Sequence, residues 1–88
     1  MKIYINGRFY DKADAKISVF DHGFLYGDGA FEGIRSYNRL IFRLNDHLDR
    51  LYETTHTLMI DAGMTKKQMT QAIIDTLNKN KLNDAYIR

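Results

Sequence analysis

The chain's most distinctive stretch reads Val19-Phe20-Asp21-His22-Gly23-Phe24-Leu25-Tyr26-Gly27-Asp28-Gly29-Ala30-Phe31-Glu32-Gly33-Ile34-Arg35, in which four glycines are interspersed with aromatic and charged residues. Glycine permits positive φ and close backbone approach but costs folding entropy, so this density predicts a constrained loop that leads into a strand. A flexible surface loop is the alternative, although such loops favour small polar residues over Phe and Tyr. The aromatic side chains therefore need a surface in their own domain, in a ligand or in another chain.

Length and composition place the chain among small globular domains. A chain of 88 residues buries only about 60 to 65% of its unfolded surface. It contains no cysteine, which excludes a disulfide framework and a thiolate metal site. The net charge is +2, with acids and bases interspersed, so no basic field exists for binding nucleic acid.

The sequence has no pattern typical of a signal peptide or of a membrane-spanning segment. The opening residues, Met1-Lys2-Ile3-Tyr4-Ile5-Asn6-Gly7, turn polar too early for a signal peptide. No apolar run approaches the roughly 18 residues that a membrane span needs. We therefore expect a cytoplasmic protein with no membrane contact.

The chain is expected to open with a β-hairpin. Residues 2–5 and 8–10 alternate apolar with polar side chains around Asn6-Gly7, the strongest short signal for a hairpin turn. Residues 11–16 are expected to form a polar turn or a single helical turn. Residues 17–20 are expected to form a short strand before the glycine-rich stretch.

A second hairpin is expected after that stretch. Residues 30–37 have an extended pattern, Asn38-Arg39 is a plausible tight turn, and residues 40–43 return as the partner strand. Asp84-Ala85-Tyr86-Ile87-Arg88 begins another strand, which stops below the usual strand length. We therefore interpret the chain as a fragment of a longer protein.

The first of two amphipathic helices is expected to start at Asn45, whose side chain can cap it. Its apolar residues recur at spacings of three and four and predict a stripe that faces a core. This stripe consists of Leu48, Leu51, Tyr52, Thr55, Leu58 and Met59.

Thr65 and Gln68 have the spacing of a capping box, which predicts the start of the second helix. Met64 and Met69 are placed to form a hydrophobic staple across that start. Asn80 is expected to end this helix in the left-handed conformation. The predicted buried stripe consists of Met69, Ala72, Ile73, Thr76 and Leu77. Together these elements predict an α+β fold, a small domain with antiparallel β-hairpins and two amphipathic helices.

Familiar phosphate and metal motifs are absent. The loop from Gly23 to Gly29 lacks the Gly-Lys-Ser/Thr ending of a nucleotide-triphosphate loop, and Glu32 stands where a dinucleotide fingerprint needs glycine. His22, His47 and His56 are too far apart to form a paired metal motif. We therefore predict no metal site.

Arg50 is a candidate binding residue because of its direction on the first helix. At 100° per residue it points roughly 145° from the mean of the apolar stripe, away from the core of its own domain. Its alternative role is a surface ion pair with Asp46 or Glu53, which stand at helical spacing.

Two strand faces also carry groups that could bind a ligand. Tyr86 and Arg88 are two residues apart, so in a strand both project from one face and could clasp an anion. Phe31, Gly33 and Arg35 share a face in the same way, with an aromatic ring, a gap for close approach and a cation. Spacing alone allows these sites without proving them.

At these residues the sequence resembles the class IV, or fold type IV, pyridoxal-phosphate aminotransferases, and specifically the branched-chain amino acid aminotransferases. The resemblance covers the whole chain, in the family's order. Its blocks are Ile5-Asn6-Gly7, Asp21-His22-Gly23-Phe24-Leu25-Tyr26-Gly27-Asp28-Gly29, Phe31-Glu32-Gly33-Ile34-Arg35, His47-Leu48-Asp49-Arg50-Leu51 and Ala85-Tyr86-Ile87-Arg88.

The resemblance implies that residues 1–88 are the small N-terminal domain of a homodimeric enzyme. A larger C-terminal domain, missing here, would hold pyridoxal 5'-phosphate in the crevice between the domains. By motif, Arg50 resembles the arginine that holds the cofactor phosphate. Tyr26 resembles a tyrosine that reaches the active site of the neighbouring subunit and its substrate.

The substrate residues are implied in the same way. Phe31 and Gly33 resemble residues that line the side-chain pocket beside the cofactor. Tyr86 and Arg88 resemble the pair that engages the carboxylate of the amino acid or of 2-oxoglutarate. Arg35 lies near this region without an assigned role.

The chain departs from the family in one decisive respect. The lysine that forms the Schiff base with the cofactor belongs to the C-terminal domain, and no lysine here matches its motif. We therefore assign no catalytic residue in this chain and expect it to be inactive alone and not to bind the cofactor.

Other activities stay open at this point. D-amino acid aminotransferases and aminodeoxychorismate lyases share the fold and the glycine-rich loop, although residues 31–35 and 85–88 favour the branched-chain enzymes. A different reading is a non-catalytic structural or dimerisation module.

Overall fold

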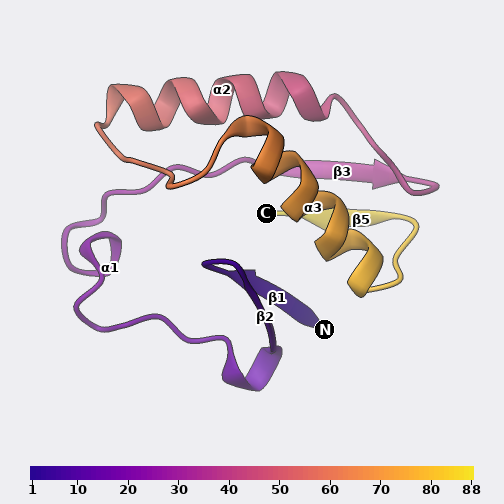
Figure 1. Cartoon of the computed structure of the whole chain (residues 1–88), viewed down its shortest axis with the longest axis horizontal. Helices are drawn as coiled ribbons and strands as arrows, with labels where there is room; N and C mark the ends of the chain where they lie inside the picture. The colour runs from indigo at the N-terminus through magenta and orange to yellow at the C-terminus, as the bar shows by residue number, and fades with distance from the viewer.

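The computed structural model describes residues 1–88 and has the expected α+β architecture, with antiparallel strands and two long helices (Figure 1). Its elements are β1 (Lys2–Ile5), β2 (Arg8–Asp11), the 3₁₀ turn η1 (Lys12–Asp14), α1 (His22–Tyr26), β3 (Ile34–Tyr37), β4 (Leu40–Ile41), α2 (Leu44–Thr57), α3 (Lys66–Lys79) and β5 (Ala85–Ile87). None of the helices is both long and apolar enough to span a bilayer.

The first hairpin is confirmed. β1 pairs with β2 in antiparallel register, Ile3 opposite Tyr10. Asn6 and Gly7 make the turn with φ of 50° and 87°, the left-handed conformations that a two-residue hairpin turn requires. The single helical turn expected after it is η1.

The second hairpin is also confirmed, and β5 extends it into a sheet of order β4-β3-β5. Asn38 and Arg39 make the turn with φ of 51° and 66°. The returning strand is shorter than predicted and ends at Ile41, because Arg43 has a left-handed backbone (φ 53°) that directs the chain into α2.

Two predictions for α2 are wrong. Arg43 rather than Asn45 precedes the helix, without a side-chain cap. The helix ends at Thr57, so Leu58 and Met59 lie beyond the apolar stripe and stay 46% and 93% exposed. Met59 has φ of 55°, which turns the chain away from the helix axis.

The capping box that starts α3 is confirmed: Thr65 accepts a hydrogen bond from the Gln68 backbone, and the Gln68 side chain accepts one from Thr65 N–H. The predicted left-handed cap at Asn80 is wrong, since its φ is −86° and Lys81 takes the left-handed conformation instead. Asn80 fastens α3 to β1, because its amide accepts from Lys2 N at 2.7 Å and donates to Lys2 O at 2.9 Å.

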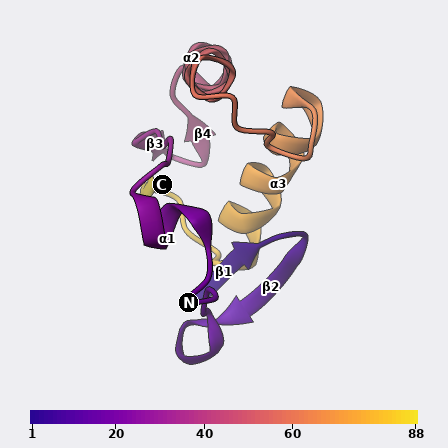
Figure 2. The same cartoon turned by 90° about the vertical axis from the view of Figure 1, so that its left-hand side faces the viewer.

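The core is small and lies between the three-stranded sheet and the two long helices. α3 contacts both α2 and β1, and Figures 1 and 2 show it between α2 and the first hairpin. Only five residues are buried, and they come from β3, α2 and α3: Ile34, Ser36, Leu48, Ala72 and Leu77. Any loss of packing among them should therefore be costly.

The strand predicted at residues 17–20 does not form, because these residues have no partner strand and make a turn in which Asp21 N–H donates to Ser18 O at 3.1 Å. The glycine-rich stretch instead contains the short helix α1. Asp21 caps its first N–H groups, and Gly27 (φ 76°) ends it in the left-handed conformation.

This region leaves its apolar side chains uncovered. In Figure 1 the chain between β2 and β3 runs around one side of the molecule, with α1 at its outer edge. We call its exposed apolar residues the apolar segment: Ile17, Val19, Phe20, Phe24, Leu25, Tyr26 and Phe31. Their exposed fractions range from 52% to 83%, which is unusual for so many large side chains in one segment.

Candidate functional site

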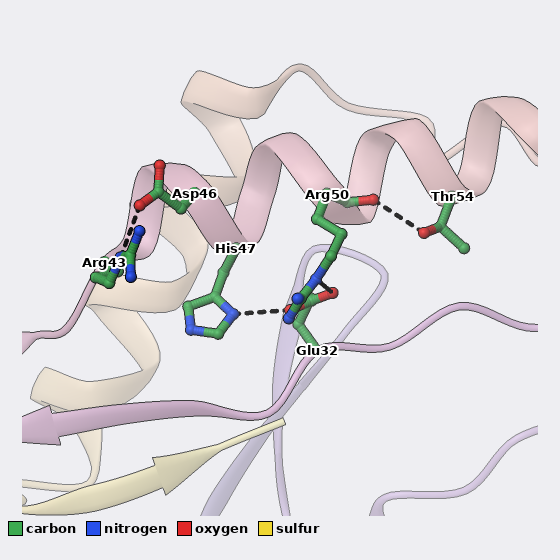
Figure 3. Close-up of polar contacts among 6 residues, drawn as sticks. All are labelled: Glu32, Arg43, Asp46, His47, Arg50 and Thr54. Atoms are coloured by element: carbon green, nitrogen blue, oxygen red, sulfur yellow. Dashed lines mark hydrogen bonds and ion pairs between the residues drawn. The ribbon is translucent and has the colours of Figure 1, made fainter.

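The first of two side-chain groups joins the strand layer to α2 through Glu32, which lies just before β3 (Figure 3). Arg50 Nε donates to Glu32 Oε2 at 2.8 Å, and Arg50 Nη2 donates to Oε1 at 2.6 Å. His47 Nδ1 lies 2.7 Å from the same Oε1. His47 and Arg50 are one helical turn apart, so both reach the carboxylate from one face of α2.

The electrostatics of this group follow from those contacts. The hydrogen bonds from Arg50 and, next, His47 lower the pKa of Glu32 from 4.5 to about 2. The Glu32 carboxylate in turn raises the pKa of Arg50 above its ordinary value. An ionised carboxylate only accepts hydrogen bonds, so His47 Nδ1 carries the proton in this contact.

Arg50 retains capacity for a second anion. Its side chain is 67% exposed, whereas that of Glu32 is 9% exposed. A guanidinium has five N–H donors, and Glu32 takes two of them. The remaining donors suit an oxyanion such as a phosphate.

The ion pairs expected for Arg50 are not the ones that form. Asp46 instead accepts from Arg43 Nε at 2.8 Å, and no ion pair joins Glu53 to Arg50. Sequence reasoning missed Glu32 and His47 as partners. The alternation of side chains along the strand could have indicated Glu32. Ile34 and Ser36 are buried on the helix-facing side of β3. Glu32 is two residues before Ile34, so its side chain is expected on that same side.

The second group lies on the other face of the sheet. β3 and β5 pair so that Arg35 is opposite Tyr86, and Arg35 Cζ lies 4.8 Å from the centre of the Tyr86 ring. Arg88 Cζ lies 4.4 Å from the centre of the Phe31 ring. The two strand faces singled out from spacing are therefore one surface.

Gly33 leaves open the space that the Tyr86 side chain occupies in this surface. A Cβ at this position would meet the Tyr86 hydroxyl and the ring carbons beside it. Tyr86 therefore lies over the Gly33 backbone, and its other face is open to solvent, since the residue is 57% exposed.

Tyr26 lies apart from both groups. It is on α1, is 71% exposed, and its ring packs on His22 with 4.6 Å between centres. His22 Nδ1 lies 3.1 Å from Asp28 Oδ2. No hydrogen bond or aromatic contact links Tyr26 to Arg50 or Tyr86.

Two clefts, of about 340 and 470 Å³, lie between the first hairpin and α3. Their lining includes Phe9, Gln71 and Asp75 but none of the candidate binding residues. Neither cleft is lined by Glu32 or by the residues that contact it.

The pH dependence of stability tests the first group. Because folding lowers the pKa of Glu32 from 4.5 to about 2, its contribution to stability is present above pH 4.5 and is lost as the pH falls towards 2. Glu32→Gln should therefore destabilise the chain at pH 7 and make little difference near pH 2. Urea unfolding of the original chain and of Glu32→Gln at pH 7 and near pH 2 measures their free energies of unfolding. The same difference in free energy at both pH values would contradict the role of Glu32.

Comparison with known proteins identifies the family. The family model described as amino-transferase class IV matches residues 29–88, about two thirds of the chain. The chain belongs to the class IV aminotransferases. The matched region includes Glu32, Arg50 and Arg88, so both side-chain groups lie within the part of the chain that matches the family model.

Several curated class IV relatives are similar over nearly the whole chain. A Methanocaldococcus jannaschii protein, provisionally assigned as a branched-chain amino acid aminotransferase, is 57% identical over 88 residues, all of this chain and 31% of the relative. An aminodeoxychorismate lyase of Bacillus subtilis is 38% identical over 98% of this chain and 29% of the relative. A D-alanine aminotransferase of Staphylococcus haemolyticus is 31% identical over 98% of the chain and 30% of the relative.

Solved structures of class IV relatives share the fold of this chain. The branched-chain aminotransferase of Thermoproteus uzoniensis with norvaline has a TM-score of 0.89 and 34% identity, over 98% of this chain and 31% of the other. The branched-chain amino acid aminotransferase of T.th. with pyridoxamine 5'-phosphate has a TM-score of 0.90 and 32% identity, over 97% and 30%. The chain thus spans about a third of the length of its class IV relatives, and its fold type is confirmed.

Proposed function

We propose that residues 1–88 form the N-terminal domain of a pyridoxal-phosphate-dependent branched-chain amino acid aminotransferase. The enzyme would move the amino group between branched-chain L-amino acids and 2-oxoglutarate. The observation that carries this proposal is the 57% identity to the Methanocaldococcus jannaschii relative over every residue of the chain. The structural likeness to two branched-chain enzymes supports it.

The cofactor role falls to Arg50. Its exposed guanidinium, with donors to spare beyond Glu32, has the chemistry that a phosphate dianion requires. Pyridoxal phosphate, when bound, supplies an electron sink for the substrate α-carbon. Arg50 would hold the phosphate, and the lysine that completes the site would come from the missing C-terminal domain.

The substrate role falls to the surface made by β3 and β5. Phe31 and the bare backbone of Gly33 would line the pocket for a branched aliphatic side chain. Tyr86 and Arg88 would bind the carboxylate of the amino acid or of 2-oxoglutarate, since a guanidinium pairs well with a carboxylate. Arg88 stacks on Phe31 here, which joins the apolar part of the surface to its anion-binding part.

The apolar segment suggests the partners. Its large exposed side chains, 52% to 83% accessible, are suited to packing against the C-terminal domain and a second subunit. Tyr26, at the tip of α1, would reach the neighbouring subunit's site. The isolated chain should then self-associate or be poorly soluble; a strictly monomeric profile on size-exclusion chromatography with light scattering would count against this.

Activity can be tested with a chimera in which residues 1–88 replace the matching part of the Methanocaldococcus jannaschii relative. The chimera with pyridoxal phosphate should transaminate leucine with 2-oxoglutarate, and the 88-residue chain alone should not. Clear activity of the chain alone would overturn the assignment as an incomplete domain.

Two other class IV activities are distinguished by swapping the host. Residues 1–88 would be placed in the same way in the D-alanine aminotransferase of Staphylococcus haemolyticus and in the aminodeoxychorismate lyase of Bacillus subtilis. If either chimera were more active in its own reaction than the first chimera is in leucine transamination, the branched-chain proposal would fail. If all three chimeras folded but none was active, the chain would be a structural or dimerisation module.

Gly33→Ala tests the substrate surface. The added Cβ would meet Tyr86 and push its ring off the sheet. Misplacing a binding group by about 1 Å costs about 10- to 100-fold in catalytic efficiency. We expect kcat/KM of the chimera for leucine to fall by that factor. Gly29→Ala is the matched control, because nothing lies within 4 Å of a Cβ there; equal losses in both variants would refute the role of Gly33.

A further inference from the structure

We propose that Glu32 is a positioning residue that holds the Arg50 guanidinium in the orientation needed to receive the cofactor phosphate. The inference rests on the proposed phosphate-binding role of Arg50 and adds a residue to it. Neither the helix geometry of Arg50 nor the family resemblance singled out Glu32.

The contact has the form that fixes a guanidinium in both direction and rotation. Two parallel hydrogen bonds, from Nε to Oε2 at 2.8 Å and from Nη2 to Oε1 at 2.6 Å, join the two planar groups edge to edge. A single hydrogen bond would leave the guanidinium free to swing. The paired contact commits one edge to Glu32 and leaves the Nη1 side for another anion.

Glu32 is itself held in place. Its side chain is only 9% exposed, and Oε1 accepts a further contact from His47 Nδ1 at 2.7 Å. The buried neighbour Ile34 anchors the backbone two residues later. Arg50, in contrast, has a long side chain that is 67% exposed and would lose much rotamer freedom on binding an anion. Glu32 removes part of that freedom before the anion arrives.

The negative charge of Glu32 repels a phosphate, whereas its contact with Arg50 orients the guanidinium. These two effects predict opposite changes in phosphate affinity when Glu32 is altered. If the carboxylate mainly competed with the phosphate for Arg50, its removal would strengthen phosphate binding. If it mainly orients Arg50, a change that keeps the charge but shortens the reach should weaken phosphate binding. Glu32→Asp makes that change, because the shorter side chain cannot span both Arg50 and His47.

The experiment measures, by equilibrium titration of the chimera, dissociation constants for pyridoxamine 5'-phosphate and for pyridoxamine. The ratio of the two isolates the phosphate contribution from folding and from ring binding. We expect Glu32→Asp to reduce the phosphate preference by about 10-fold, a size typical for loss of a residue that orients a binding side chain. An unchanged or increased preference would overturn the proposal.

Controls separate this inference from the role of Arg50. Arg50→Ala should lose most of the phosphate preference, and if it does not, the phosphate role of Arg50 is wrong. If Arg50→Ala loses the preference but Glu32→Asp keeps it, only the positioning role of Glu32 is rejected. Asp46→Asn, which breaks an ion pair with Arg43 on the same helix, should leave the preference unchanged. Should Glu32→Asp fail to fold, Glu32→Gln decides: a reduced preference supports positioning, and an equal or greater one rejects it.

Discussion

Replacing Arg50 by alanine should lower the affinity of the chimera for pyridoxamine 5'-phosphate by about 100-fold, a loss that reflects several charge-assisted hydrogen bonds to one phosphate. Affinity for pyridoxamine, which lacks the phosphate, should change much less. The expectation follows from the spare donors of a guanidinium that is 67% exposed. Titration with both compounds, followed by the absorbance of the bound ring, measures the difference.

Two variants check this result. Arg43→Ala removes another exposed arginine at the start of the same helix, which pairs with Asp46 instead, and should leave the affinity unchanged. Arg50→Lys keeps the charge but loses the planar two-bond contact with Glu32, so it should rescue only part of the binding. Equal losses of pyridoxamine and its phosphate in Arg50→Ala would show that Arg50 supports the fold rather than the phosphate.

Leu48→Ala should have the largest effect on stability, about 2 to 5 kcal/mol, the usual cost of truncating a buried leucine. Leu48 is 2% exposed and is the largest fully buried side chain of the domain. A domain of this size has only a modest margin of stability, so the variant should be largely unfolded. Urea denaturation of the chain, followed by circular dichroism, gives the change in the unfolding free energy.

Met59→Ala provides the matched comparison for Leu48→Ala. Met59 is 93% exposed, so its truncation should change the unfolding free energy by less than about 0.5 kcal/mol. If the two variants were equally stable, Leu48 would not be part of a packed core, and α2 would not pack against the sheet through this residue.

The predictions that succeeded depend on neighbours in sequence. Asn6-Gly7 specified the first hairpin because few residue pairs adopt two left-handed backbones in a row. Thr65 and Gln68 specified the start of α3 because they satisfy each other's backbone N–H groups. The helix α1 carries comparable local signals, Asp21 before it and Gly27 after it, but five residues are too few to show an apolar periodicity.

The predictions that failed depend on what a segment meets in space. Residues 17–20 have an apolar pattern suited to a strand, yet no neighbouring strand pairs with them, and a strand without a partner leaves its backbone unpaired. Asn80 does end α3, but not in the predicted left-handed conformation, and its side-chain amide hydrogen-bonds to Lys2 of β1, 78 residues away. Leu58 and Met59 continue the helical spacing beyond the point where the backbone turns.

The sequence by itself determined the turns, the capped helix, the α+β class and the family of this protein, because each is encoded in residues close together or in motifs that keep their order. Tertiary structure alone decided that Arg50 binds Glu32 rather than Asp46, and that Tyr86 lies over Gly33. These contacts join residues 18 or more positions apart. They depend on how α2 and β5 pack around β3, and no local spacing specifies that geometry.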